Sequence, residues 1–230
     1  MNFIDDACGR YVLKANRKEL EKHYNLASVP KDLKPNYNVA PGQRLPVVTA
    51  DENGKMEMEL MKWGIVAPWK QTMIIINTRD DKVFNSPMWK GLVSKKRALI
   101  PASGFYEWKK PEHSKDLKQP FYIHPKQMDL FSFAGIWSSW KDVEGVEFKT
   151  YSIITTSPNK EMTSVHNRMP VILHQSEEAD WLEPSKTSQE DLEPYLHPYE
   201  DRGLEMYEVS RDVNSSRVNN EKLILPIAAQ

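Results

Sequence analysis

The chain contains one cysteine, Cys8, and this count limits how a fold of 230 residues can be held together. A single thiol cannot close an internal disulfide, and it is too few for a cysteine-based metal site. The fold must therefore depend on a hydrophobic core, and 40% hydrophobic residues with seven Trp, nine Tyr and seven Phe are enough to build one. Cys8 itself is either a small buried hydrophobe, as free cysteines commonly are, or a nucleophile.

The spacing of apolar residues predicts a single domain rich in strands. Residues 45–49 and 56–63 flank a turn and predict a hairpin, and helices are expected at 14–24 and 175–182, whereas the proline-bounded segment 30–41 is expected to be a loop. Further strands are expected at 73–77, 97–100, 104–109, 121–124, 130–137, 148–155, 205–209 and 223–228. Turns rather than crossover helices join most strands, which indicates an α+β fold with a curved, largely antiparallel, barrel-like sheet and peripheral helices.

The balance of charged residues limits the classes of partner that this chain could bind. The chain has 31 Lys and Arg against 32 Asp and Glu, which argues against a protein that coats duplex DNA through bulk charge, although a local arginine cluster could still grip a few phosphates. There is no apolar run of about 18 residues and no secretory signal at the start of the sequence. We therefore expect no membrane contact and a cytoplasmic monomer, nucleoid-associated if the chain is bacterial. No HxxxH or Cys/His cluster occurs, so neither a metal nor a cofactor is expected.

Two further polar residues stand where packing does not require them. Glu107 lies inside an aromatic strand and shares a face with Phe105, while Tyr106 and Trp108 point the other way. A glutamate in that setting is either an exposed edge residue or a partly buried acid whose raised pKa suits proton transfer. Asn77 ends an apolar run, where it either turns the chain or serves a site.

His166 and three arginines complete the candidate polar set. The histidine is either a structural loop residue or a group that moves protons near neutral pH. Arg10, Arg79 and Arg168 each lie two residues beyond Cys8, Asn77 and His166 respectively, a spacing that puts both side chains on one face of an extended strand. Taken singly each arginine is a solvated surface charge; taken together they predict an anion site.

Exposed aromatic residues at a cleft would provide stacking platforms for single-stranded DNA, at about 1–3 kcal/mol per base. Most of the tryptophans Trp63, Trp69, Trp89 and Trp108 are expected in the core, with one or two, beside Pro41, at the cleft.

Six motifs contain these residues: CGR (8–10), YNVAP (37–41), WGIVAPW (63–69), NTR (77–79), LIPASGFYEW (99–108) and HNRMPV (166–171). In this order and over residues 8 to about 173, they resemble the SOS response-associated peptidase (SRAP) family. The resemblance implies one SRAP domain that recognises abasic sites in single-stranded DNA. It further implies that the α-amine and thiol of an N-terminal cysteine react with the sugar aldehyde, first as an imine and then as a stable thiazolidine.

The resemblance also implies a role for each residue. Cys8 is the nucleophile, Asn77 holds the sugar or the cysteine, Glu107 orients the α-amine and moves protons, and His166 is a general acid/base in ring opening and reversal. The remaining residues are implied to bind DNA, through phosphates for three of them and through the cleft and bases for the others: Arg10, Arg79, Arg168, Pro41, Trp69 and Trp108.

Residues 1–7 depart from the family pattern, in which the cysteine directly follows the initiator methionine. Asn2 is too large for the usual methionine removal, so we expect residues 1–7 to be a leader cut between Ala7 and Cys8, with residues 8–230 as the domain. The cut could be autocatalytic, with Cys8 as nucleophile and Glu107 and His166 assisting. Two other functions are weighed beside the abasic-site crosslinker: a thiol peptidase acting on itself or another protein, and a noncatalytic single-stranded DNA binder.

Overall fold

A closed barrel of five strands forms the centre of the computed structural model, which describes residues 8–111 and 117–229. Its strands are β3 (Arg44–Ala50), β4 (Met56–Trp63), β8 (Arg97–Ala102), β11 (Phe131–Lys141) and β12 (Glu147–Thr156). The barrel closes because β12 pairs with β11 on one side and with β4 on the other. The β12–β4 pair is parallel, whereas the other pairs around the ring are antiparallel.

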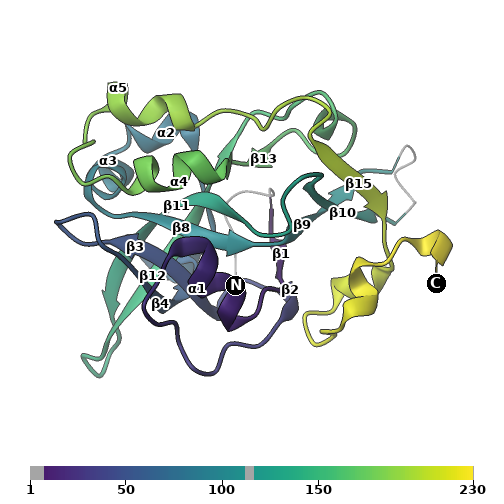
Figure 1. The fold of residues 1–230 in the computed structure, drawn as a ribbon, viewed down its shortest axis with the longest axis horizontal. Helices are drawn as coiled ribbons and strands as arrows, with labels where there is room; N and C mark the ends of the chain where they lie inside the picture. The colour runs from purple at the N-terminus through teal and green to yellow at the C-terminus, as the bar shows by residue number, and fades with distance from the viewer. Residues whose placement is uncertain (1–7, 112–116, 230) are drawn as a thin grey trace.

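A second sheet packs against the barrel (Figure 1). Cys8 lies two residues before one of its strands. Its order is β15 (Leu204–Glu208), β10 (Gln119–Pro125), β9 (Gly104–Lys109), β1 (Arg10–Leu13) and β2 (Asn36–Val39), all antiparallel. One face joins the main core, and the other packs on a smaller cluster that includes Val12, Tyr106 and Val213.

Helices and short strands lie around these two sheets (Figure 1). The helices are α1 (Arg17–Tyr24), α2 (Asp80–Val83), α3 (Pro87–Lys95), α4 (Gln175–Leu182) and α5 (Gln189–Leu192), with 3-10 turns η1 (Met162–Ser164), η2 (Glu193–Tyr195), η3 (Arg211–Asn214), η4 (Glu221–Ile224) and η5 (Ile227–Ala229). The remaining strands are β5 (Ile65–Ala67), β6 (Lys70–Ile75), β7 (Asn77–Arg79), β13 (Met169–Pro170) and β14 (Ile172–Leu173).

The predicted α+β class with a barrel-like sheet and peripheral helices is confirmed. Two local predictions are wrong. The expected loop 30–41 contains β2. Its backbone N–H and C=O groups find partners by pairing with β1, and the polar composition of this segment does not indicate that pairing. The strand expected at 223–228 is replaced by η4 and η5, with a single bridge from Val209 to Pro226; proline has no N–H with which to extend that ladder. The leader predicted for residues 1–7 lies outside the described residues.

Gly104 explains the first letter of the GFYEW motif. A Cβ at this position would lie far inside van der Waals contact with the Tyr122 ring. Tyr122 is held there because its hydroxyl donates to the Ser103 carbonyl at 2.8 Å. The close approach of β10 to β9 therefore requires glycine, and it fixes the strand that carries Glu107.

Within the described ranges, no helix has the length and apolar character needed to cross a membrane. The same part of the chain contains no group of three or more His, Cys, Asp or Glu side chains arranged to hold a metal ion.

Candidate functional site

Cys8 and Glu107 meet on the core face of the second sheet. Cys8 precedes β1, whose residues Arg10, Tyr11 and Val12 pair with Tyr106, Phe105 and Gly104 of β9. This register brings the backbone N–H of Cys8 to Glu107, and it donates a short hydrogen bond to the Glu107 carboxylate. Both residues are buried, Cys8 completely and Glu107 with 2% exposure. Of the two alternatives that the sequence left for Glu107, an exposed edge residue or a buried acid, the structure shows the buried one.

The backbone at Cys8 is unusual. Its φ of 42° lies in the left-handed region, which side chains other than glycine rarely adopt. Such a conformation costs on the order of 1–3 kcal/mol and persists where the surroundings enforce it. Here the hydrogen bond to Glu107 and the burial of the side chain enforce it.

Aromatic residues line the core beside the thiol. The hydroxyls of Tyr11 and Tyr151 are 2.7 Å apart, and both rings pack on Trp63, Tyr11 edge-on at 5.1 Å and Tyr151 stacked at 6.3 Å. Burial raises the pKa of the Cys8 thiol well above its usual value, and the charge of Glu107 raises that pKa further. The thiol is therefore protonated at neutral pH and needs a proton acceptor before or during attack.

Strand β12 arranges the second part of the site. Beyond Tyr151, Ile153 pairs with Asn77 and Thr155 pairs with Arg79, both in parallel register with β7. The Arg168 guanidinium donates to the Thr155 carbonyl at 2.6 Å, from the opposite side of the same strand end. Asn77 is buried at 3% exposure. The structure thus brings Asn77, Arg79 and Arg168 together around the carboxyl end of β12.

His166 is joined to this group through the backbone of Arg168. Its Nδ1 lies 3.2 Å from both the backbone N–H and the backbone carbonyl oxygen of Arg168, so it can accept from the first or, when it carries a proton, donate to the second. The ring is half-buried, two residues beyond the end of the short turn η1. These contacts fix the orientation of the His166 ring against the backbone of Arg168.

Two carboxylates that the sequence analysis missed hold the arginines. Asp80 accepts from Arg168 at 2.7 Å and from the Thr156 hydroxyl at 2.7 Å. Asp81 binds Arg79 through two hydrogen bonds of 2.9 and 3.0 Å, and these lower the pKa of Asp81. The sequence feature that could have indicated them is the pair of aspartates directly after the NTR motif, which are also the first two residues of α2.

Arg10 and Trp108 lie on the other face of the sheet. The Arg10 guanidinium donates to the Asn38 side chain and to the Val213 carbonyl, both at 2.7 Å, and the Trp108 indole N–H donates to Asn214 at 2.7 Å. The prediction that Arg10 shares a face with Cys8 is wrong, because Cys8 precedes the strand in a left-handed conformation and its side chain enters the main core.

The remaining predicted cleft residues are on the surface. Trp69 is 65% exposed in the turn between β5 and β6, and Pro41 is half-buried two residues beyond the end of β2. Trp63 and Trp89, which the sequence left between core and cleft, are buried.

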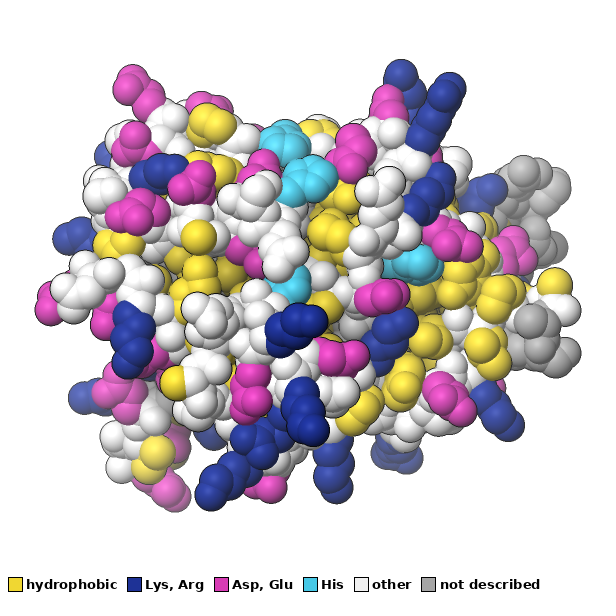
Figure 2. Space-filling view, viewed as in Figure 1, with side chains coloured by type: hydrophobic (Ala, Val, Ile, Leu, Met, Phe, Trp, Pro, Cys, Tyr) yellow, Lys and Arg dark blue, Asp and Glu magenta, His cyan; other side chains and the backbone are white. Residues whose placement is uncertain are grey.

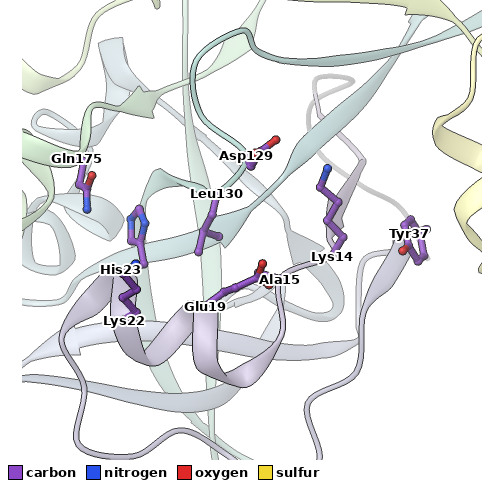
Figure 3. Close-up of a pocket in the computed structure, with 9 residues that line it drawn as sticks. All are labelled: Lys14, Ala15, Glu19, Lys22, His23, Tyr37, Asp129, Leu130 and Gln175. Carbon is purple, nitrogen blue, oxygen red and sulfur yellow. The ribbon is translucent and has the colours of Figure 1, made fainter.

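A cavity of about 440 Å³ lies at the far end of β1 (Figure 3). It is lined by residues that include Lys14, Lys22, His23, Asp129 and Gln175. Its His23 is bonded to the buried Glu178 at 2.9 Å. Because Lys14 follows the last residue of β1 whereas Cys8 precedes the first, this cavity is separate from the Cys8–Glu107 pair.

Charges of both signs cover the face shown in Figure 2, where Lys and Arg side chains are interspersed with Asp and Glu. This surface agrees with a net charge of −1. On this face, binding of an anion would depend on particular cationic side chains rather than on a broad basic field.

The site therefore combines a buried cysteine–carboxylate pair with an asparagine, a histidine and arginines bonded to carboxylates at one strand end. The family model for "SOS response associated peptidase (SRAP)" matches residues 7–216, and the chain belongs to this family. The expected resemblance is thereby confirmed.

Known relatives align with most of the length of this chain. The chain is 35% identical over 223 residues to the abasic site processing protein YoqW of Bacillus subtilis, covering 94% of this chain and 98% of that protein. It is 28% identical over 227 residues to the abasic site processing protein HMCES of Xenopus tropicalis, covering 84% and 66% respectively. A crystal structure of a protein from Bacteroides thetaiotaomicron superposes with a TM-score of 0.81 at 27% identity, over 95% of this chain and 99% of that one.

Proposed function

We propose that this protein processes abasic sites in single-stranded DNA by forming a covalent thiazolidine crosslink through Cys8. The contact between the Cys8 nitrogen and the buried Glu107 carboxylate carries the proposal, because a nitrogen that must attack an aldehyde needs a proton acceptor beside it. The names of the relatives, abasic site processing proteins, support the substrate.

The chemistry requires both groups of an N-terminal cysteine. The α-amine adds to the C1′ aldehyde of the ring-opened sugar and loses water to give an imine. The thiol then adds across the C=N bond, its sulfur to carbon and its proton to nitrogen, and closes the five-membered ring. Because burial and Glu107 raise the pKa of the thiol, this second step uses the neutral thiol and returns its proton within the site.

The other residues act around this pair. His166 acts as the general acid/base that exchanges a proton in opening of the sugar ring, and Asn77 holds the sugar beside the cysteine. Arg79 and Arg168 bind the phosphates that flank the lesion, at the strand end where β12 holds them together. Trp69 is exposed for stacking on a neighbouring base, and Pro41 borders the cleft.

A free amine on Cys8 further requires that residues 1–7 be removed. We propose autocatalytic cleavage between Ala7 and Cys8. As the sulfur attacks the Ala7 carbonyl carbon, the Glu107 carboxylate takes the thiol proton and passes it to the Cys8 nitrogen when the C–N bond breaks. Water then hydrolyses the thioester, which releases residues 1–7 and restores the thiol. Two observations support this route: the Cys8 nitrogen already contacts Glu107, and the backbone at Cys8 is strained.

The test mixes the full chain with single-stranded DNA that carries one abasic site, beside a short form in which Cys8 directly follows the initiator methionine. Heat-stable adducts are scored on a denaturing gel, and intact mass reports cleavage after Ala7. Adducts from both forms, with loss of residues 1–7, are the expected result. Adducts from the short form alone would reject self-processing but keep the crosslink. Adducts from neither form would reject the covalent mechanism and favour a noncatalytic DNA binder.

Asp81→Asn is expected to strengthen binding of undamaged single-stranded DNA by about two- to fivefold. The carboxylate occupies Arg79 in the free protein, so a phosphate must displace it. Fluorescence anisotropy at several salt concentrations measures the affinity. Asp32→Asn, which removes the same charge from an exposed turn, serves as the control, and equal gains in both variants would show that only net charge matters.

A further inference from the structure

The C-terminal part of the chain covers the face of the second sheet that is opposite to Cys8 and Glu107. We call residues 209–226 the C-terminal clasp; they include η3 and η4 and appear in yellow beside β2 and β15 in Figure 1. Val209, Val213 and Leu223 of the clasp are buried against side chains of β1, β9 and β10. The clasp is therefore a packed part of the sheet rather than a loose tail.

Two polar side chains bind the clasp to β1 and β2. Arg10 of β1 donates to the Val213 carbonyl and to Asn38 of β2, both at 2.7 Å. Asn38, which is completely buried, donates in turn to the Ser215 carbonyl at 3.0 Å and the Val218 carbonyl at 2.7 Å. Burial lowers the pKa of the Arg10 guanidinium, as expected for a cation enclosed by neutral carbonyls.

Further bonds extend this attachment across three strands. The Tyr106 hydroxyl of β9 donates to the Tyr37 carbonyl of β2 at 2.8 Å, and the Tyr37 N–H donates to Asn219 of the clasp at 2.8 Å. Trp108 of β9 adds its bond to Asn214. The clasp is thus bonded to β2, β1 and β9 together.

These hydrogen bonds lie on the opposite face of the sheet from Cys8 and Glu107, at neighbouring positions of the same strands. Arg10 is two residues beyond Cys8 and stands opposite Tyr106, which precedes Glu107. Strand β1 has only four residues, and its pairing with β2 shifts register between Tyr11 and Leu13. A strand so short and irregular forms few backbone hydrogen bonds with its neighbours. Side-chain hydrogen bonds must therefore contribute much of the free energy that keeps its first residues in place.

We propose that Arg10 and Asn38 are positioning residues: by binding the clasp they hold the start of β1 so that Cys8 stays buried against Glu107. The catalytic part of this inference rests on the proposed function. It differs from the expectation that Arg10 holds a DNA phosphate, and the two give opposite results below.

Because Cys8 is the one cysteine of the chain, its alkylation by iodoacetamide reports the opening of β1 without any DNA. In the full chain, Arg10→Gln and Asn38→Ala are each expected to accelerate alkylation about tenfold or more, the effect of losing a buried hydrogen bond to a charged or fully enclosed group. Asn219→Ala, a milder change at an exposed position, is expected to accelerate it less. Mass spectrometry follows the rate, and urea unfolding gives the stability of each variant.

Two controls separate local opening from other effects. Arg217→Gln removes one positive charge from an exposed position of the clasp and is expected to leave alkylation unchanged. Leu192→Ala, in the buried face of α5, lowers global stability away from β1 and should not reproduce the acceleration at equal stability. Unchanged alkylation in the Arg10 and Asn38 variants, or equal acceleration in Leu192→Ala, would overturn the proposal.

A second measurement uses the adduct-forming form of the protein. A positioning role predicts slower adduct formation at saturating abasic DNA in Arg10→Gln, with DNA affinity and its salt dependence unchanged. A phosphate contact predicts instead weaker binding and a salt slope reduced by about one, with Asn38→Ala normal. If the parent chain forms no adduct, the proposed function fails while the alkylation test of the clasp remains decisive.

Discussion

Cys8→Ser is expected to abolish the heat-stable adduct while leaving a reversible one. In the short form, where position 8 directly follows the initiator methionine, removal of that methionine from the serine variant would still expose an α-amine that forms an imine with the aldehyde. A hydroxyl is a much weaker nucleophile than a thiol, so the ring does not close and water returns the imine to its components. Heating in denaturant should then release free DNA from the variant, whereas the parent short form keeps it.

Borohydride makes this prediction sharp, because it reduces an imine to a stable amine but does not act on a thiazolidine. The Cys8→Ser short form should give a permanent adduct only with borohydride, and the parent short form should give one with or without it. Cys8→Ala is expected to behave as Cys8→Ser. A heat-stable adduct from either variant without reductant would place the covalent bond on another residue and remove the thiol from the mechanism.

The sequence predicted the motif-bearing strands well because their apolar alternation and turn residues are local signals. The GFYEW strand and the β3–β4 hairpin are examples, and the face that Glu107 shares with Phe105 follows from strand period alone. The same rule misplaced Arg10, since it assumes that Cys8 already belongs to the strand. The left-handed backbone at Cys8 breaks the alternation two residues before β1 begins.

Contacts between segments that lie far apart in the sequence could not be predicted from local residue patterns. Val213 lies 203 residues from Arg10, and nothing near Arg10 indicates that its partner is a carbonyl of the clasp. Asn38 looks like a polar loop residue in the sequence, yet it is completely buried because β1, β2 and the clasp meet around it. The Asp80–Arg168 pair likewise depends on β7 and β13 lying beside the same end of β12.

Glu107→Gln is expected to slow adduct formation by about 10²- to 10⁴-fold, the usual contribution of a positioned acid or base. Glutamine keeps an oxygen that can accept the hydrogen bond from the Cys8 nitrogen, and its size is nearly that of glutamate. The change therefore removes the charge and the proton acceptor while preserving the contact that places Cys8. Single-turnover rates at saturating abasic DNA measure the effect, with exposed Glu208→Gln in β15 of the same sheet as control.

The pKa of the Cys8 thiol gives this variant a second, opposite signature. The negative charge of Glu107 helps to raise that pKa, so its removal lowers the pKa and increases the thiolate fraction at any given pH. Alkylation of Cys8 in the full chain should therefore begin at lower pH in Glu107→Gln than in the parent chain. A variant with a more reactive thiol and a slower crosslink would show that proton transfer at the amine limits the rate. Slower alkylation together with a slower crosslink would instead mean that the substitution displaced Cys8, and a parent-like crosslinking rate would remove Glu107 from the chemistry.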